Sequence, residues 1–172
     1  MGPVSQIKHV ILCDTREQKR LEFAHPDIAF TKKHKLEVGD YCIRFMDGSV
    51  PAVIFERKGI GDLFGTLTGD YDRFKAEIIR AKDSGITLIL VIEGSFSKVM
   101  KGYKYFNPRN PDTKVHMDGL RIIRILFSLY VRYGVIPVFC KDREEMQNYI
   151  VEYYLAIWRK KQGQKLVKRS VQ

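Results

Sequence analysis

Short apolar runs rich in β-branched residues recur along this chain, and several of them end abruptly in charged residues. An uninterrupted apolar run such as residues 86–92 is typical of a strand that is buried on both faces of a sheet. Residues 36–45 alternate more loosely and are followed by Asp47-Gly48, a pair that predicts a tight turn into the next strand. The predicted strands are residues 8–13, 36–45, 50–57, 86–92 and 135–140.

Between these runs, apolar residues recur at intervals of three and four, a spacing that predicts amphipathic helices. The first helical segment covers residues 62–82, with Asp62 as its expected N-cap and two glycines that weaken its first turns. The second runs from an N-cap at Asp118 to Gly134, and the third covers residues 142–161. The few polar side chains of the second helix lie on one stripe, so we expect the rest of that helix to be packed into the domain.

Strands that alternate with helices predict an α/β fold with a central mixed β-sheet flanked by helices. A length of 172 residues and an apolar content of 45% suffice for one domain with a buried core. We expect this domain to span residues 8–161 and to carry a long polar insert at residues 95–117. Residues 1–7 are expected to be a disordered N-terminus or a cloning remnant, and residues 162–172 a basic flexible tail.

The net charge of +10 is concentrated in the second part of the chain. Residues 1–95 contain 14 basic and 14 acidic side chains, whereas residues 96–172 contain 16 basic and 6 acidic ones. An excess of this kind suits contact with a polyanion such as a nucleic-acid backbone, although a basic surface also serves solubility alone.

The positions of the cysteines and the hydropathy of the chain indicate where in or outside the cell the protein works. Cys13, Cys42 and Cys140 lie within apolar runs, at spacings that match neither a disulfide framework nor a zinc site, which is typical of a reducing interior. No secretory signal opens the sequence, and the apolar run at residues 120–131 is too short and too interrupted by arginine to span a bilayer. We therefore expect an intracellular protein, in cytoplasm, nucleoid or nucleus according to its host, with no membrane partner.

The strand that ends at Phe55 runs directly into Glu56, Arg57 and Lys58. Alternate side chains of a strand share a face, so Glu56 and Lys58 point the same way and Arg57 points oppositely. A carboxylate can hold a divalent metal ion, and a nearby ammonium can balance charge that develops on a phosphate. The pair therefore suits phosphodiester cleavage, although a solvated strand end shows the same pattern.

Acidic residues also follow two other predicted strands. Asp14 and Glu17 close the strand at residues 8–13, and Asp40 lies in the hairpin. Acids at neighbouring strand ends converge, and carboxylate oxygens are the ligands that Mg²⁺ and Mn²⁺ prefer. Singly, each acid would be an ordinary surface carboxylate, but converging carboxylates repel one another unless a cation lies between them. The sequence therefore predicts a site for Mg²⁺ or Mn²⁺.

These motifs resemble those of the nuclease domain of XPF-type structure-specific endonucleases, a branch of the restriction-endonuclease-like fold. The resemblance covers residues 8–158 and implies a metal-dependent endodeoxyribonuclease that acts on branched, flap or fork DNA. The matching motifs, in the family's order, are Asp14-Thr15-Arg16-Glu17, Gly39-Asp40-Tyr41 and Glu56-Arg57-Lys58-Gly59-Ile60-Gly61-Asp62.

The resemblance also implies roles for individual residues. Asp14, Asp40 and Glu56 would bind the metal. Lys58 would orient the water or stabilise the transition state. Glu17, Arg57 and Asp62 would complete the catalytic site.

The sequence departs from the family after its signature motif. Residues 69–74 add acids where the family has Gly-Arg, and Glu77 stands where Gln is usual, which leaves the DNA contacts of Arg73 open. The tandem helix-hairpin-helix module that commonly follows this domain is not found, so we expect a free-standing nuclease domain. Two alternatives remain open: a catalytically silent DNA-binding or scaffolding subunit, and a junction-resolving or restriction-type nuclease. The full set of charged site residues favours an enzyme.

The insert at residues 95–117 interleaves cations with aromatic side chains. This composition suits phosphate contact and stacking on unpaired bases, although aromatics that pin the loop to the core explain it equally well. The candidate DNA-binding residues are Arg16, Arg73, Lys98, Lys101, Tyr103, Lys104, Tyr105 and Arg109.

The last predicted helix carries an apolar band broader than one side of a small sheet requires. Part of the band must be an ordinary core face, but Tyr and Trp are also favoured at interfaces. Nuclease domains of the family that it resembles pair through their last helices, so we expect a homodimer. The predicted interface residues are Tyr149, Ile150, Tyr153, Ile157 and Trp158.

Overall fold

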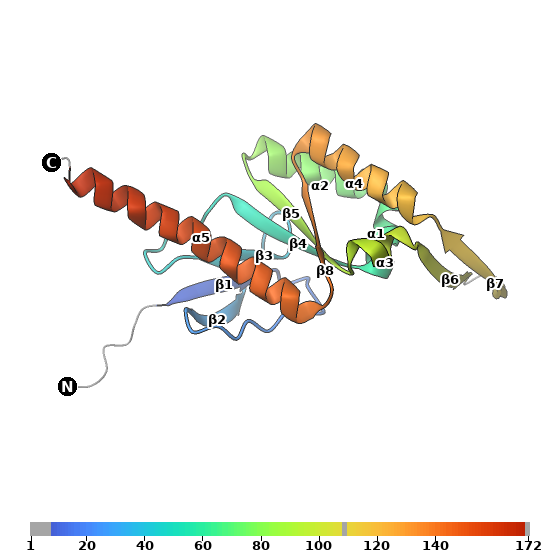
Figure 1. The fold of residues 1–172 in the computed structure, drawn as a ribbon, viewed down its shortest axis with the longest axis horizontal. Coiled ribbons are helices and arrows are strands. Elements are labelled where there is room, and N and C mark those ends of the chain that lie inside the picture. The colour runs from blue at the N-terminus through green and yellow to red at the C-terminus, as the bar shows by residue number, and fades with distance from the viewer. Residues whose placement is uncertain (1–7, 108–109, 171–172) are drawn as a thin grey trace.

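The computed structural model describes residues 8–107 and 110–170, and within them six strands form one mixed sheet (Figure 1). These strands are β1 (His9–Cys13), β2 (Ile28–Lys33), β3 (Tyr41–Arg44), β4 (Val53–Gly59), β5 (Thr87–Glu93) and β8 (Ile136–Cys140). Their order in the sheet is β2-β1-β3-β4-β5-β8. β3 pairs antiparallel with β1 and β4, and the other neighbouring pairs are parallel. The predicted mixed sheet is confirmed.

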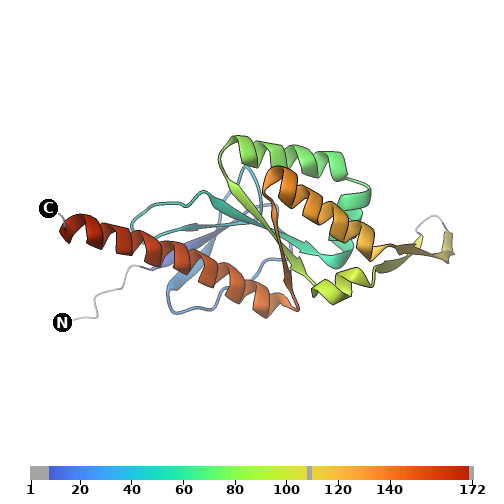
Figure 2. The same cartoon turned by 45° about the horizontal axis from the view of Figure 1, so that its top comes forward.

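Helices cover both faces of this sheet (Figures 1 and 2). They are α1 (Ile60–Thr68), α2 (Tyr71–Asp83), α3 (Phe96–Met100), α4 (Gly119–Tyr133) and α5 (Arg143–Ser170). On one face, α1, α2 and α4 pack with Leu88, Leu90 and Ile92 of β5, and on the other face α5 packs with Ile89 and Val91. Because successive side chains of a strand alternate between faces, a strand covered on both sides needs apolar residues throughout.

The segment predicted as one ragged helix over residues 62–82 forms two helices. α1 begins at Ile60, so Asp62 lies in its first turn and does not cap it. α1 ends before Gly69, whose N–H donates to the carbonyl of Gly65 at 2.8 Å. The glycines that weaken the helical pattern thus mark a break between two helices.

Two parts of the fold differ from the expectations drawn from the sequence. The edge strand β2 was not predicted, because of its six residues only Ile28 is buried and no apolar alternation marks it. The insert at residues 95–117 is not a loop: it folds into α3 and an antiparallel hairpin of β6 (Tyr103–Asn107) and β7 (Asn110–Met117). This hairpin projects from the body of the molecule at the end opposite to the C-terminal part of α5 (Figures 1 and 2).

Both long helices also differ from expectation. We expected α4 to be buried everywhere except along its polar stripe. However, Phe127 is 48% exposed, Tyr130 52% and Val131 80%. α5 continues to Ser170, so residues 162–170, predicted as a flexible tail, are helical. No helix among the described residues is both long and apolar enough to cross a membrane.

A buried tyrosine fixes α5 on the sheet. The hydroxyl of Tyr154 lies 3.1 Å from the carbonyl oxygen of Tyr41 in β3 and 3.0 Å from that of Val53 in β4. The ring of Phe55 packs edge-on against Tyr154 and Tyr153. These contacts hold α5 against the strand that carries the candidate site residues.

Candidate active site

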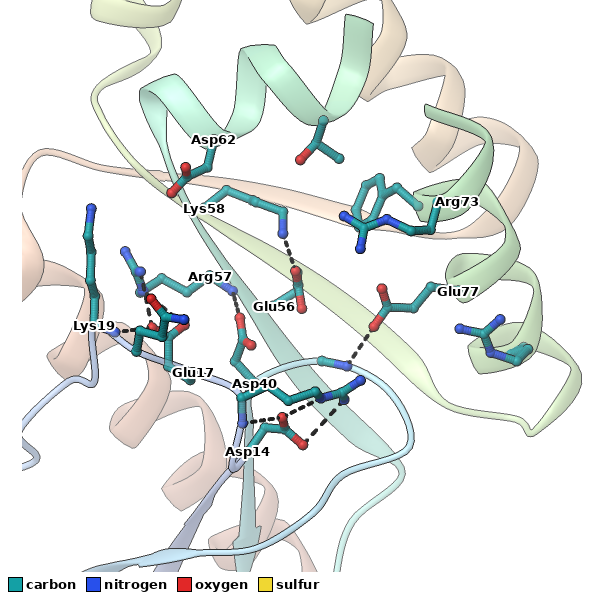
Figure 3. A pocket seen from close by; sticks show the side chains of 16 residues that line it. Asp14, Glu17, Lys19, Asp40, Glu56, Arg57, Lys58, Asp62, Arg73 and Glu77 are labelled. Atoms are coloured by element: carbon teal, nitrogen blue, oxygen red, sulfur yellow. Dashed lines mark hydrogen bonds and ion pairs between the residues drawn. The ribbon is translucent and has the colours of Figure 1, made fainter. Parts of the chain in front are cut away.

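A pocket of about 590 Å³ opens where the ends of β1 and β4 meet α1 and α2 (Figure 3). Six acidic and six basic side chains line it, a composition that suits both a cation and a polyanion. The lining residues are Asp14, Arg16, Glu17, Gln18, Lys19, Gly39, Asp40, Glu56, Arg57, Lys58, Asp62, Thr66, Arg73, Phe74, Glu77 and Arg80. The structure therefore brings together all seven predicted catalytic residues.

Asp40, which immediately precedes β3, and Glu56 of the neighbouring strand β4 lie close together in the pocket. The carboxylate of Asp40 accepts a hydrogen bond from the N–H of Arg57 at 2.8 Å, which ties it to β4. Burial and the nearby charge of Glu56 raise the pKa of Asp40 to about 8, and burial likewise raises the pKa of Glu56. A cation close to these two carboxylates would favour their ionised forms.

Gly39 allows the chain to bring Asp40 to this position. Its φ is +68°, and a Cβ there would lie 2.4 Å from Cγ2 of Ile54 and 3.1 Å from the carbonyl oxygen of Phe55. Only glycine avoids both the strained backbone and the clash. The Gly-Asp pair read from the sequence therefore has a physical reason: the glycine lets Asp40 approach β4 closely.

Lys58 shares a face of β4 with Glu56, as the alternation of strand side chains predicts. Its Nζ forms an ion pair with Oε1 of Glu56 and lies 5.6 Å from the ring centre of Phe74 (Figure 3). Burial lowers the pKa of Lys58, but the carboxylate of Glu56 outweighs it and the pKa is raised overall. Lys58 is thus a cation in the pocket, beside the paired carboxylates.

Arg57 is committed to ion pairs with two acids. Its guanidinium lies 3.2 Å from Oε1 of Glu17 and 3.2 Å from Oε2 of Glu93 at the end of β5. Arg143, at the start of α5, also approaches Glu93 and donates to the carbonyl of Lys19 at 2.9 Å. The side chains of Arg57 and Glu17 are each more than nine-tenths buried, so this network joins β4, β5 and α5 at one wall of the pocket.

Asp14 is saturated with hydrogen bonds. Its carboxylate accepts from the N–H of Arg16 at 2.9 Å, from Nε of Arg16 at 2.7 Å and from the N–H of Leu36 at 2.7 Å. Burial raises the pKa of Asp14, but these donors outweigh it and the pKa is lowered overall. Among the residues that the structure describes, no three Asp, Glu, His or Cys side chains are grouped closely enough to hold a metal ion.

Glu77 of α2 is a pocket residue to which the sequence analysis gave no role. Its Oε1 accepts a hydrogen bond from the N–H of Gly39 at 3.1 Å, and its charge contributes to the raised pKa of Glu56 (Figure 3). A signal was present in the sequence: Arg73, Glu77 and Arg80 recur at intervals of four and three, so they share one face of a helix.

Basic side chains form the rim of the pocket. Arg16 is 66% exposed, and Arg73 is 83% exposed beside Asp70 at 3.5 Å. Lys19 and Arg80, which the sequence analysis did not select, are exposed on the same rim. A phosphate backbone entering the pocket would therefore meet cations before it reaches the carboxylates.

The remaining predicted DNA contacts lie outside the pocket. Lys98 is exposed on α3, and Lys101 follows that helix. Lys104 and Tyr105 are exposed on β6, whereas Tyr103 is half-buried against Phe64. Arg109 lies outside the described residues.

Several of the predicted interface residues of α5 already pack against other residues of the same chain. Ile150 is fully buried in the core, so it is not available to a partner. Trp158 packs against His9 and Phe45, with ring centres 5.0 and 5.2 Å apart. Tyr149, Tyr153 and Ile157 are half-buried and keep part of their surface exposed.

A comparison with protein-family models decides where this chain belongs. The model of the ERCC4 domain matches residues 13–153, which include every residue of the pocket. This chain belongs to the ERCC4 domain family. The match confirms the resemblance to XPF-type nuclease domains drawn from the motifs. No curated protein sequence matches the chain.

Two solved structures show the same fold as this member of the ERCC4 domain family. XPF from Aeropyrum pernix is 18% identical with a TM-score of 0.51, and the match covers 81% of this chain and 62% of that one. XPF from Aeropyrum pernix in complex with DNA is 17% identical with a TM-score of 0.56, covering 89% and 66%. The chain thus spans less than two thirds of either XPF chain, and at these identities the match establishes the fold.

Proposed function

We propose that this protein is a divalent-metal-dependent endodeoxyribonuclease that hydrolyses a phosphodiester bond in branched, flap or fork DNA. The observation that carries this proposal is the pair of Asp40 and Glu56 beside Lys58, in a pocket with a basic rim. Membership of the ERCC4 domain family supports it, as does the fold shared with an XPF structure described as a complex with DNA. We further propose that the enzyme works inside the cell, where its three buried free cysteines would remain reduced.

Asp40 and Glu56 are the residues that we expect to hold Mg²⁺ or Mn²⁺. Their oxygens are suitable ligands, and a cation between them would relieve the repulsion that raises both pKa values. When bound, the ion supplies an activated water and polarises the phosphate. We assign Asp14 to a positioning role in place of the ligand role implied by the resemblance, because Arg16 and Leu36 already occupy its oxygens.

The chain's own groups bind and orient the DNA. Lys58 is placed to balance the charge that develops on the phosphate during cleavage. Arg73, Arg80 and Lys19 on the rim would hold the backbone on either side of the pocket. The ion pairs of Arg57 keep the end of β4 in place, so that Glu56 and Lys58 stay on the pocket side.

A cleavage panel tests this function. Labelled flap, fork, nicked, four-way-junction and linear DNAs are incubated with Mg²⁺, with Mn²⁺ or with chelator. We expect cleavage of branched DNA only with metal and its loss in Glu56→Gln. Glu152→Gln, at an exposed position of α5, serves as the matched control and should cleave normally.

Each other outcome of the panel identifies a different function. Cleavage confined to four-way junctions indicates a junction-resolving enzyme, and cleavage of linear duplex at defined sequences indicates a restriction-type enzyme. Binding of branched DNA without cleavage under any metal condition indicates a silent DNA-binding or scaffolding subunit and overturns the proposed activity.

We also propose a homodimer, on a wider surface than α5 alone. β8 is an edge strand whose Ile136 and Val138 are half-buried, and α5 places Tyr153 and Ile157 on the same side of the sheet. α4 packs beside β8 on the opposite side and presents its exposed apolar residues to solvent. A two-fold interface would cover both sets of apolar residues at once.

Light scattering at micromolar concentration tests this assembly. We expect a mass near twice the 20.0 kDa of the chain. Phe127→Asp with Val131→Asp should yield a folded monomer, as should Tyr153→Glu with Ile157→Glu. A monomeric parent protein contradicts the proposal, and a dimer that survives both double substitutions has its interface elsewhere.

A further inference from the structure

The hairpin of β6 and β7 has two chemically different faces. Its antiparallel register places Tyr103 opposite Met117, Tyr105 opposite Val115 and Lys104 opposite His116. Because side chains of a strand alternate between faces, Tyr103 and Tyr105 lie on an apolar face with Val115 and Met117. Lys104, Lys114 and His116 lie on the opposite face together with Asp112, and all four are exposed. Because two lysines stand there against one acid, we call it the basic face.

The apolar face is anchored next to the candidate active site. The ring of Tyr103 packs against Phe64 of α1, with ring centres 5.7 Å apart. Its hydroxyl lies so close to Gly61 that a Cβ there would be 2.9 Å from the oxygen. Gly61 precedes Asp62, a residue of the pocket wall. The hairpin therefore starts at the edge of the pocket and leads outward.

The root of the hairpin has a fixed geometry. Gly102, which immediately precedes β6, has a φ of +81°, and a Cβ there would lie 2.4 Å from the carbonyl oxygen of Met117. Such close backbone packing holds the two strands against each other where they leave the domain. Gly102 thus allows β6 and β7 to approach each other closely at the base of the hairpin.

An aromatic ring is left open on the apolar face. Tyr105 stacks on Tyr103, with ring centres 6.3 Å apart and an interplanar angle of 21°, yet it is 38% exposed. Its neighbour Tyr103 is half-buried, so the row of rings runs from the pocket edge into solvent. A ring held flat against another ring offers its free face to a planar partner such as a nucleobase.

We propose that this hairpin is a DNA-binding arm whose apolar face stacks an unpaired base on Tyr105 while its basic face contacts the phosphates of a second strand. The inference rests on the proposed DNA-cleaving function of the pocket and adds a second binding element, which would recognise the point where a single strand leaves a duplex. Two faces of opposite chemistry suit the space between two diverging strands, because one strand presents bare bases there and the other its backbone.

Binding measured without metal tests the arm independently of cleavage. Fluorescence anisotropy in chelator compares a fork that carries 2-aminopurine at the first unpaired position with a duplex of equal length. We expect the parent protein to prefer the fork and to quench the 2-aminopurine. Tyr105→Ala should weaken fork binding by ~10-fold or more, the scale of one stacked base, and abolish the quenching without changing duplex binding.

Matched variants separate stacking from other effects. Tyr105→Phe keeps the ring and should retain fork preference and quenching. Phe30→Ala removes a more exposed aromatic residue from the distant edge strand β2 and should change neither. Lys104→Ala with Lys114→Ala should lower the salt dependence of fork binding by about two units of slope, whereas Lys160→Ala on α5 should lower it by less than one.

Two results would overturn the proposal of a DNA-binding arm. In the first, Tyr105→Ala binds the fork with the same affinity as the parent protein. In the second, Tyr105→Ala loses affinity equally for fork and duplex. If the protein shows the fork preference and quenching but cleaves no DNA, the result supports the DNA-binding arm and contradicts the proposed cleavage activity. Conversely, if the protein cleaves forks and Tyr105→Ala binds them as the parent does, the result supports the activity and contradicts the arm. Circular dichroism of each variant establishes that it is folded.

Discussion

The two faces at the end of β4 differ in how their charged side chains are balanced. On the side of Arg57, every charge has a partner: the guanidinium is more than nine-tenths buried between Glu17 and Glu93. On the side of Glu56 and Lys58, two carboxylates have raised pKa values in an open pocket. A buried charge with a partner is tolerated as long as both partners are present, whereas a surplus of buried negative charge opposes folding and favours the binding of a cation. The same strand end therefore contributes Arg57 to an ion-pair network that supports the fold, and Glu56 and Lys58 to the candidate active site.

The largest effect on stability is expected on the balanced side. Arg57→Ala leaves Glu17 buried without its partner, and breaking a buried pair in this way costs about 3–5 kcal/mol of unfolding free energy. Urea denaturation of the metal-free protein measures it, with Arg57→Lys as an intermediate variant that keeps the charge and loses the two-sided contact. A loss below ~1 kcal/mol would show that this network does not support the fold.

On the pocket side, the largest effect is expected in cleavage. Lys58→Ala should lower the rate by ~100-fold or more, the scale of a single electrostatic stabiliser, while DNA binding largely survives. Its unfolding free energy should fall by less than that of Arg57→Ala, because Lys58 is not enclosed between two acids. If Lys58→Ala and Glu56→Gln both cleave at the parent rate over a range of Mg²⁺ concentrations, the assignment of this face is wrong.

The pH dependence of stability sharpens the contrast. Asp40 has a pKa of about 8 in the fold, against 3.8 as its ordinary value, so between these values the folded chain binds more protons than the unfolded chain. Stability of the metal-free protein should therefore fall as pH rises from about 4 to about 8. Asp40→Asn should remove this contribution and be at least ~1 kcal/mol more stable than the parent at pH 8.5, since one pKa unit corresponds to ~1.4 kcal/mol.

Urea denaturation between pH 5 and 9 in chelator measures this difference. Added Mg²⁺ should reverse it, because the ion binds the ionised carboxylates of the parent and finds one fewer in the variant. A parent and variant whose stabilities change in parallel with pH would contradict the raised pKa of Asp40.

The smallest expected effect concerns Glu77. Glu77→Gln keeps an acceptor for the N–H of Gly39 but removes a charge that raises the pKa of Glu56, so Glu56 should ionise at lower pH. The acid limb of the pH–rate profile should move to lower pH by a fraction of a unit. Glu77→Ala should show the same shift and lose about 1 kcal/mol of stability with the hydrogen bond. An unmoved limb in both variants would exclude an electrostatic role.

The sequence alone determined the strands and the chemistry at their ends. The apolar runs at β1, β5 and β8 and the charges after Phe55 are local patterns, and the alternation of strand side chains correctly predicted that Glu56 and Lys58 face away from Arg57. The motifs also identified the ERCC4 domain family, because its signature residues lie within short, ungapped segments.

Tertiary structure decided the features that depend on distant neighbours. β2 became a strand by pairing with β1, α4 left Phe127 exposed, and α2 packed where Glu77 lines the pocket. Asp14 lost its predicted ligand role in our proposal because Leu36, 22 residues away, occupies one of its oxygens. Hydrophobic periodicity specifies which face of an element is buried, but which residues meet there is set by the packing of elements far apart in the chain.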